Sequence, residues 1–182
     1  MTFRIVATVA IIFVGSWHAA SAQPANSNER GPHMNDHSSM HLAGQTQTGP
    51  RARTHAQAKI VVRNSEAKPY DQTAGPTLVE IFINETFSGD IDGESPVRAL
   101  QVSRHDKFAS MVSVQRFRGK LHGRESSFVL QGSEIVEAGR IKATWFVVPG
   151  SGTGDLAGLG GEGGFEGDFG KGSDGWLDYW FE

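Results

Sequence analysis

Apolar and polar residues alternate along most of the chain after residue 58. In residues 77–87, the apolar Val79, Ile81, Ile83 and Phe87 share one face, opposite the polar Glu80, Asn84 and Thr86. Residues 140–148 repeat this pattern. Because successive side chains of a β-strand point to opposite sides, a period of two predicts strands that place one face against a core. No segment shows a comparable 3.6-residue stripe, so the region is predicted to be all-β.

Eight strands are expected, joined mostly by short connections that are polar or contain glycine. They are residues 59–63, 77–87, 97–104, 108–120, 126–132, 140–148, an interrupted strand near 156–169, and 176–181. Short connections favour antiparallel neighbours. Eight such strands fit either a closed barrel or a sandwich. The regular hairpin order favours a single barrel, which also removes exposed strand edges.

Residues 1–22 have the pattern of a secretory signal peptide. Arg4 precedes the uncharged apolar run 5–17, and the Ala-Ser-Ala sequence at 20–22 fits a cleavage site. The run is shorter than the roughly 20 residues that a membrane helix needs, so no stable anchor is expected after cleavage. The mature chain is expected to begin at Gln23 and to be secreted or periplasmic.

Residues 23–57 are predicted to be a disordered tail, with a barrel domain following at 58–182. The tail is rich in polar residues and glycine and has almost no large apolar side chains to bury. His33, His37 and His41 recur every fourth residue within it. Imidazole suits copper, nickel or zinc, although an unstructured segment offers no preformed geometry. The alternative is that this histidine spacing is an incidental result of the polar composition of the tail. No cofactor is predicted for the protein.

The absence of cysteine rules out disulfides and a cysteine-linked lipid, and the charge of the chain argues against a nucleic-acid-binding protein. With no cysteine among 182 residues, the exported domain can have neither disulfides nor a lipid-modified cysteine. Removal of residues 1–22 takes away Arg4 and no acidic residue, leaving 16 basic against 20 acidic residues, a net charge of −4. A nucleic-acid binder normally carries a basic surface, so nucleic acid is not an expected partner.

Three residues are candidates for the inner wall of the barrel. Glu85 lies on the otherwise apolar face of its strand, where burial would raise its pKa and make it a plausible acid or base. The alternative places Glu85 at the rim or in a salt bridge. Gln115 and Trp145 could line the same interior, and Trp145 could equally be ordinary core packing.

The glycine-rich segment 150–154 invites comparison with a phosphate-binding loop. Such loops open a long helix, and here more glycine follows within a few residues, with no lysine after the loop. A sharp corner of the barrel is therefore favoured, because glycine permits positive φ and hydroxyl groups bond nearby backbone. Contact of Ser151, Thr153 and Asp155 with a ligand is the alternative.

The region 59–182 resembles a bacterial family of proteins with a domain of unknown function, grouped with the allene oxide cyclase-like barrels. The most specific match is Ser151-Gly152-Thr153-Gly154-Asp155-Leu156-Ala157-Gly158-Leu159, followed by Gly161-Glu162-Gly163. The resemblance implies an eight-stranded antiparallel barrel and no established activity. The family often has Glu where this chain has Gln115, and His where it has Gly132.

Three functions are consistent with these patterns. The first is an exported barrel that binds a small, mostly apolar ligand or serves as an interaction module, since eight-stranded barrels can hold one small ligand. The second is a cyclase or isomerase that shapes its substrate within the barrel. Its candidate polar groups are Glu85, Gln115, Ser151, Thr153 and Asp155. The third is metal handling through the tail.

Overall fold

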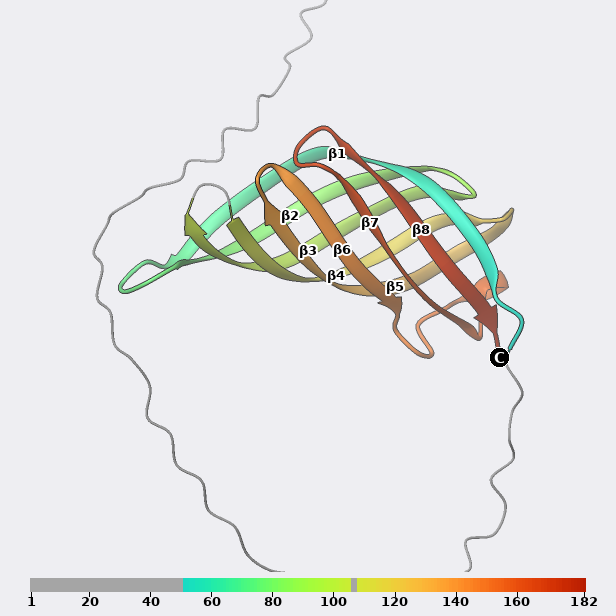
Figure 1. Ribbon diagram of the computed structural model, residues 1–182. Helices are drawn as coiled ribbons and strands as arrows, with labels where there is room; N and C mark the ends of the chain where they lie inside the picture. The colour runs from blue at the N-terminus through green and yellow to red at the C-terminus, as the bar shows by residue number, and fades with distance from the viewer. Residues whose placement is uncertain (1–50, 106–107) are drawn as a thin grey trace, which may run out of the picture.

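The eight strands form one closed antiparallel barrel, as the sequence pattern predicts (Figure 1). The computed structural model describes residues 51–105 and 108–182. Each strand pairs with the next along the chain, and β8 pairs with β1. The strands are β1 (Thr54–Asp71), β2 (Thr77–Gly89), β3 (Ile91–His105), β4 (Phe108–Leu121), β5 (Arg124–Glu137), β6 (Arg140–Val147), β7 (Leu159–Asp168) and β8 (Gly172–Phe181).

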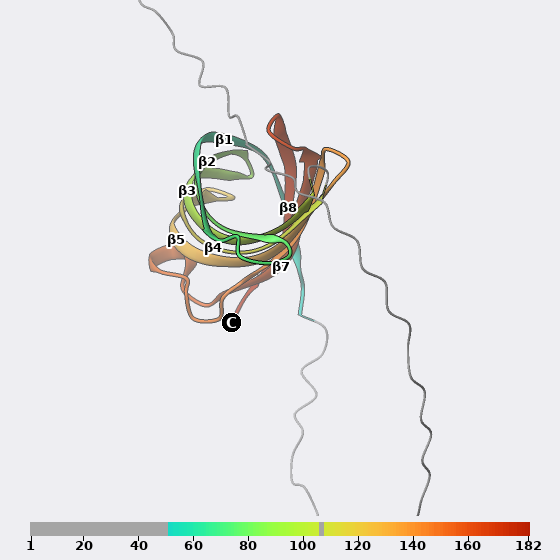
Figure 2. The same ribbon diagram turned by 90° about the vertical axis from the view of Figure 1, so that its left-hand side faces the viewer.

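Alternation of side chains decides which face of the sheet lies inside. On β4, Phe117 and Leu121 are completely buried, whereas Arg116 and Arg118, on either side of Phe117 in the sequence, are exposed. Seen from the end where the β1–β2 hairpin lies, the strands curl into a ring (Figure 2). The inner wall is therefore made of every second side chain of each strand.

Aromatic side chains fill one half of the barrel. The ring of Phe117 packs edge-on against that of Phe87, with 5.5 Å between the ring centroids. It also packs at a tilt against the ring of Phe128, with 4.9 Å between the centroids. Trp145 extends this cluster, with its ring 5.2 Å from that of Phe165. Such ring contacts add to the stabilisation that burial of the apolar surface provides. This half of the interior is a packed core.

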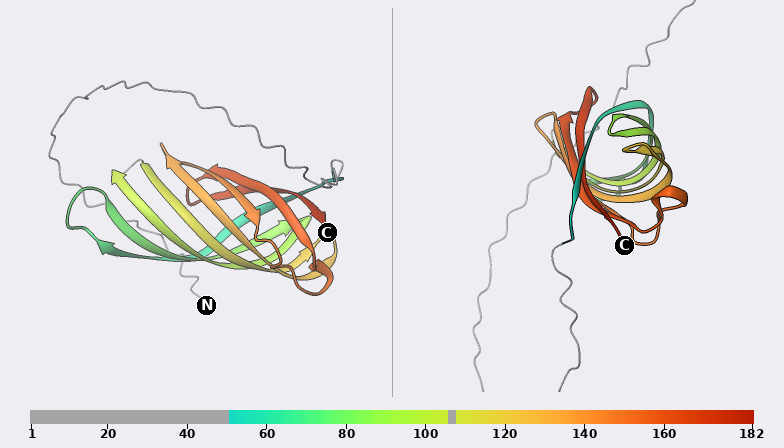
Figure 3. Two further views of the ribbon diagram at one scale, coloured as in Figure 1. Left: turned by 90° about the horizontal axis from the view of Figure 1, so that it is seen from below. Right: turned by 90° about the vertical axis from the view of Figure 1, so that its right-hand side faces the viewer.

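The barrel closes through a short seam between its first and last strands. β8 pairs with β1 only over Thr54–Ile60, where the two strands lie side by side (Figure 3). The rest of β1, from Val61 to Asp71, is paired within the described chain on one side only, with β2. The β1–β2 hairpin consequently projects beyond the other turns at that end. The half of the barrel that contains the seam is thus closed all round. In the other half, β1 has no second strand among the described residues to pair with.

β1 is much longer than the expected strand at 59–63. It begins at Thr54, before the expected domain start at residue 58. Ala56 and Ala58 are its first inward side chains, and both are buried in the core. Alanine has little strand propensity, so a segment whose buried positions are alanines gives a weak strand signal.

Several other strands also extend beyond their expected limits, and one segment is divided. β3 begins at Ile91 because the β2–β3 connection is a tight turn at Gly89, whose φ is +136°. A Cβ there would lie 2.7 Å from the backbone oxygen of Gln57, so only glycine fits without a shift. The interrupted segment near 156–169 consists of a short 3₁₀ turn, η1 (Gly154–Leu156), and β7.

The expected signal peptide and most of the tail, including His33, His37 and His41, lie outside the described residues. Over the part of the chain that the structure describes, no helix is both long and apolar enough to cross a membrane.

Candidate functional site

The half of the barrel without the seam contains a group of buried polar side chains on its inner wall. Five of them lie on four consecutive strands and are here called the polar belt: Glu85 on β2, Ser95 on β3, Ser113 and Gln115 on β4, and Glu134 on β5. Buried polar residues are uncommon unless they are bonded or functional, so this grouping is the candidate site.

Strand register makes the polar belt continuous. Ser95 lies directly opposite Glu85 across the β2–β3 pair. Gln115 lies opposite Val97, two residues along β3 from Ser95 on the same face. Side chains that are opposite or diagonal across paired strands are close enough to interact. The belt therefore runs across the sheet as neighbouring groups.

Ser113 and Glu134 form the far end of the belt. The hydroxyl of Ser113 donates a hydrogen bond to Oε1 of Glu134. Gly132 leaves room for this bond, because a Cβ there would lie 2.9 Å from that Oε1 and 3.1 Å from the Ser113 Oγ. Gln115 thus belongs to the belt, and Gly132 lies beside its Ser113–Glu134 bond.

Three buried polar atoms of the belt have no hydrogen-bond partner among the described residues. They are Oγ of Ser95, Oε1 of Gln115 and Oε2 of Glu134, in side chains that are 1%, 5% and 6% exposed. A buried polar atom without a partner costs about 1–3 kcal/mol. Such atoms call for a partner from outside the chain, such as water, an ion or a bound molecule.

Burial also changes the ionisation of the two carboxyl groups. It raises the pKa of Glu85 to about 7, and the charge of Glu134 adds to this effect. Burial likewise raises the pKa of Glu134, opposed in part by the hydrogen bond from Ser113. The belt therefore contains a carboxyl group that gains and loses a proton close to neutral pH.

Apolar side chains next to the belt are open to solvent. Ile81 and Ile83 share the inward face of β2 with Glu85, yet both are only half-buried. Their partners across β1 are Ala67 and Ser65, which are exposed. Val62, the partner of Glu85, is 41% exposed. The inner face of the β1–β2 ribbon thus offers accessible apolar surface that leads to buried polar groups.

The structure separates the predicted site residues into two sets. Glu85 and Gln115 are both in the belt, and Glu85, at 9% exposed, is not the rim residue that the alternative proposed. Trp145 belongs to the aromatic cluster, where its Nε1 donates to the backbone oxygen of Trp176 at 3.0 Å. It serves as core packing in this position.

The second set lies on the corner between β6 and β7. Oγ of Ser151 accepts a hydrogen bond from the backbone N–H of Val129 at 3.0 Å. Oγ1 of Thr153 contacts the hydroxyl of Ser126 at 2.7 Å, and Asp155 is exposed on η1. These hydroxyls fasten the corner to β5, so the five-residue catalytic grouping is not assembled.

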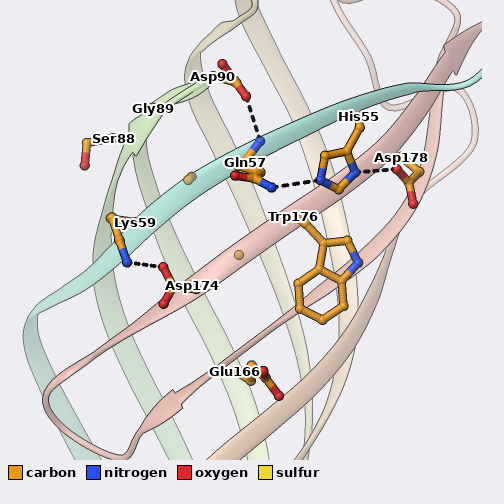
Figure 4. Close-up of a pocket in the computed structure, with 12 residues that line it drawn as sticks. His55, Gln57, Lys59, Ser88, Gly89, Asp90, Glu166, Asp174, Trp176 and Asp178 are labelled. Carbon is orange, nitrogen blue, oxygen red and sulfur yellow. Dashed lines mark hydrogen bonds and ion pairs between the residues drawn. The ribbon is translucent and has the colours of Figure 1, made fainter.

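A shallow depression on the outside of the barrel follows the seam (Figure 4). It lies over β1 and β8, and its charged groups are already paired: Lys59 with Asp174, and His55 with Asp178 at 2.7 Å between Nδ1 and Oδ1. Asp90 accepts a hydrogen bond from the Gln57 backbone N–H at 3.0 Å. Exposed pairs of this kind bridge the two strands and contribute little energy each. The depression is therefore a weaker candidate than the belt.

The described residues contain no cluster of three or more histidine or acidic side chains that could hold a metal ion. The metal hypothesis concerned His33, His37 and His41, which lie outside them.

Fold and site together define a class: an eight-stranded antiparallel barrel with a packed aromatic half and a half lined by buried acids. The chain belongs to the DUF3224 family, described as proteins of unknown function, whose model matches residues 56–181. A solved structure of a DUF3224 protein of unknown function from Shewanella oneidensis MR-1 is similar, with a TM-score of 0.58 and 27% identity. The match covers 72% of this chain and 99% of that protein. No curated protein matches the chain.

Proposed function

We propose that the protein binds a small, mostly apolar ligand against the inner wall of the half that lacks the seam. The observation that carries this proposal is the set of three unpartnered buried polar atoms in the belt: Ser95 Oγ, Gln115 Oε1 and Glu134 Oε2. A ligand that supplies hydrogen bonds to them would remove the cost of burying them.

The neighbouring side chains support an apolar body for this ligand. Ile81 and Ile83 are half-buried on the inward face, and Val62 is exposed beside them. Covering such surface stabilises a complex by about 25 cal/mol per Å² of apolar area. Binding sites for small molecules commonly combine an apolar lining with a few polar groups.

Titration of the mature chain with the neutral fluorescent probe Nile red should give saturable binding that decanol displaces. The variant Ile83→Gln should weaken the affinity about tenfold, because it replaces apolar contact surface with an amide that must lose its water. The matched control is Val112→Gln, at a 58% exposed position on the outer face of β4, and it should bind as the wild type does.

Absence of saturable binding would reject the proposal. Equal weakening by Val112→Gln would move the site to the outer face, where Leu100 and Val114 are also exposed.

The second candidate function, acid–base isomerisation, is favoured by the buried Glu85 with its pKa of about 7. Deuterium entering a bound ligand in heavy water with wild type, and not with Glu85→Gln, would favour it. The resemblance to the allene oxide cyclase-like barrels is a further argument for this second candidate, the isomerase.

We also propose that the chain is exported, since residues 1–22 have the pattern of a cleavable signal. Expressed with this segment in a bacterium, the protein should be recovered outside the cytoplasm with a mass corresponding to a start at Gln23. Replacing Ala20 and Ala22 with arginine should abolish processing, because the cleavage site requires small side chains. Recovery of the wild-type chain in the cytoplasm with residues 1–22 intact would reject export.

A further inference from the structure

We infer that the ligand carries a positively charged amine, which the polar belt binds while an apolar chain covers the inner face of the β1–β2 ribbon. This inference rests on the proposed function and names the chemical class of the ligand. It follows from the kinds of atoms that the belt presents.

The belt presents acceptors. Glu85 and Glu134 each bring a carboxyl group, and the unpartnered atoms of Gln115 and Glu134 are both oxygens that accept hydrogen bonds. Ser95 adds a hydroxyl, which can also accept. An ammonium group has three donors and no acceptor, which matches this set. A carboxylate or phosphate ligand would instead add acceptors to a group that already lacks donors.

The charge of the interior points the same way. The buried polar and charged residues of the described chain include two acids and no lysine or arginine: Glu85, Ser95, Gln101, Ser113, Gln115 and Glu134. Buried charges in proteins are paired or become neutral. A cation on the ligand would allow Glu85 and Glu134 to ionise as its partners, and an anionic ligand would be repelled.

The polar and apolar parts of the site lie in the order that a molecule with an amine at one end of an apolar chain requires. Glu85 is the innermost polar residue of β2, and Ile83 and Ile81 follow on the same face towards the β1–β2 hairpin. Val62 and Ser65 face Glu85 and Ile83 from β1. An amine held at Glu85 would therefore place an alkyl chain along accessible apolar side chains.

The test compares three probes of equal chain length: decylammonium, decanol and decanoate. Calorimetric titration of the mature chain at pH 7.5 should show decylammonium binding at least about tenfold more tightly than decanol, with decanoate weakest. Glu134→Gln and Glu85→Gln should each reduce the affinity for decylammonium about tenfold and reduce that for decanol much less, because decanol carries no charge. Thermal unfolding of each variant would establish that it is folded.

The matched control is Asp174→Asn, which removes an exposed carboxylate from the outer depression along the seam. It should leave all three affinities unchanged. If Asp174→Asn weakens decylammonium binding as much as Glu134→Gln does, the amine binds outside and the inference is wrong. Decanol or decanoate binding as tightly as decylammonium would overturn the amine and leave the apolar site standing. If none of the probes binds, the proposed function itself fails.

Discussion

Replacing Phe117 by alanine is expected to lower the free energy of unfolding by about 3–5 kcal/mol, the range for a buried phenylalanine truncated in a core. Phe117 is completely buried, and its ring packs against Phe128 from the neighbouring strand β5 and against Phe87 from β2, two strands away. The rigid sheet around it cannot collapse fully into the space, so the cavity adds to the lost burial. Urea unfolding followed by tryptophan fluorescence would measure the change.

The control for this substitution is Val112→Ala on the same strand. Val112 points outward and is 58% exposed, so its truncation should cost less than about 1 kcal/mol. A loss below about 1 kcal/mol for Phe117→Ala would show that the aromatic half is not the tightly packed core described here.

Stability is expected to fall by about 3 kcal/mol as the pH rises from about 4.5 to above 7, because of Glu85. Burial raises the pKa of this group from 4.5 to about 7. Between these values the folded protein holds a proton that the unfolded chain has released, so unfolding becomes easier as the pH increases. Each unit of difference in pKa corresponds to about 1.4 kcal/mol. Below about 4.5 both states are protonated, and this penalty is absent.

Urea unfolding across this pH range would measure the effect in wild type and in Glu85→Gln. The variant should lose most of the fall and be more stable than wild type above pH 7; Glu134, whose pKa is also raised, accounts for the remainder. Glu125→Gln, which alters an exposed side chain on β5, leaves both buried acids in place and should keep the wild-type fall. A pH-independent stability in wild type would contradict the burial of Glu85.

The strand pattern predicted the fold well where inward positions are large and apolar. Residues 77–87 and 108–120 match β2 and β4 closely, since aliphatic and aromatic side chains mark their buried faces. The prediction was weakest at β1, where Ile60 is the only large buried inward side chain, preceded by two alanines and followed by residues exposed to solvent. Nothing local distinguishes such a strand, because its pairing comes from β2 and from the distant β8.

The candidate site was predicted in part. The apolar face around Glu85 marked it as an inward carboxylate, and Gln115 was also recognised. Glu134 was missed, although it alternates with Leu130 and Val136 on the buried face of β5 and the same reasoning would have found it. The expected strand ended at residue 132, before Glu134. That these acids lie on one wall follows from strand register, which a sequence alone does not specify.

The seam has a consequence for the way the chain is made. Thr54 is hydrogen-bonded through the ladder to the strand that contains Tyr179, so the first strand to leave the ribosome obtains its second neighbour from the last. Joining such distant segments adds little to the entropy cost, which grows only with the logarithm of the intervening length. It does delay ring closure until synthesis is nearly complete. Before that pairing forms, any sheet made by the other strands has two bare edges, β1 and β8, which can pair with other chains.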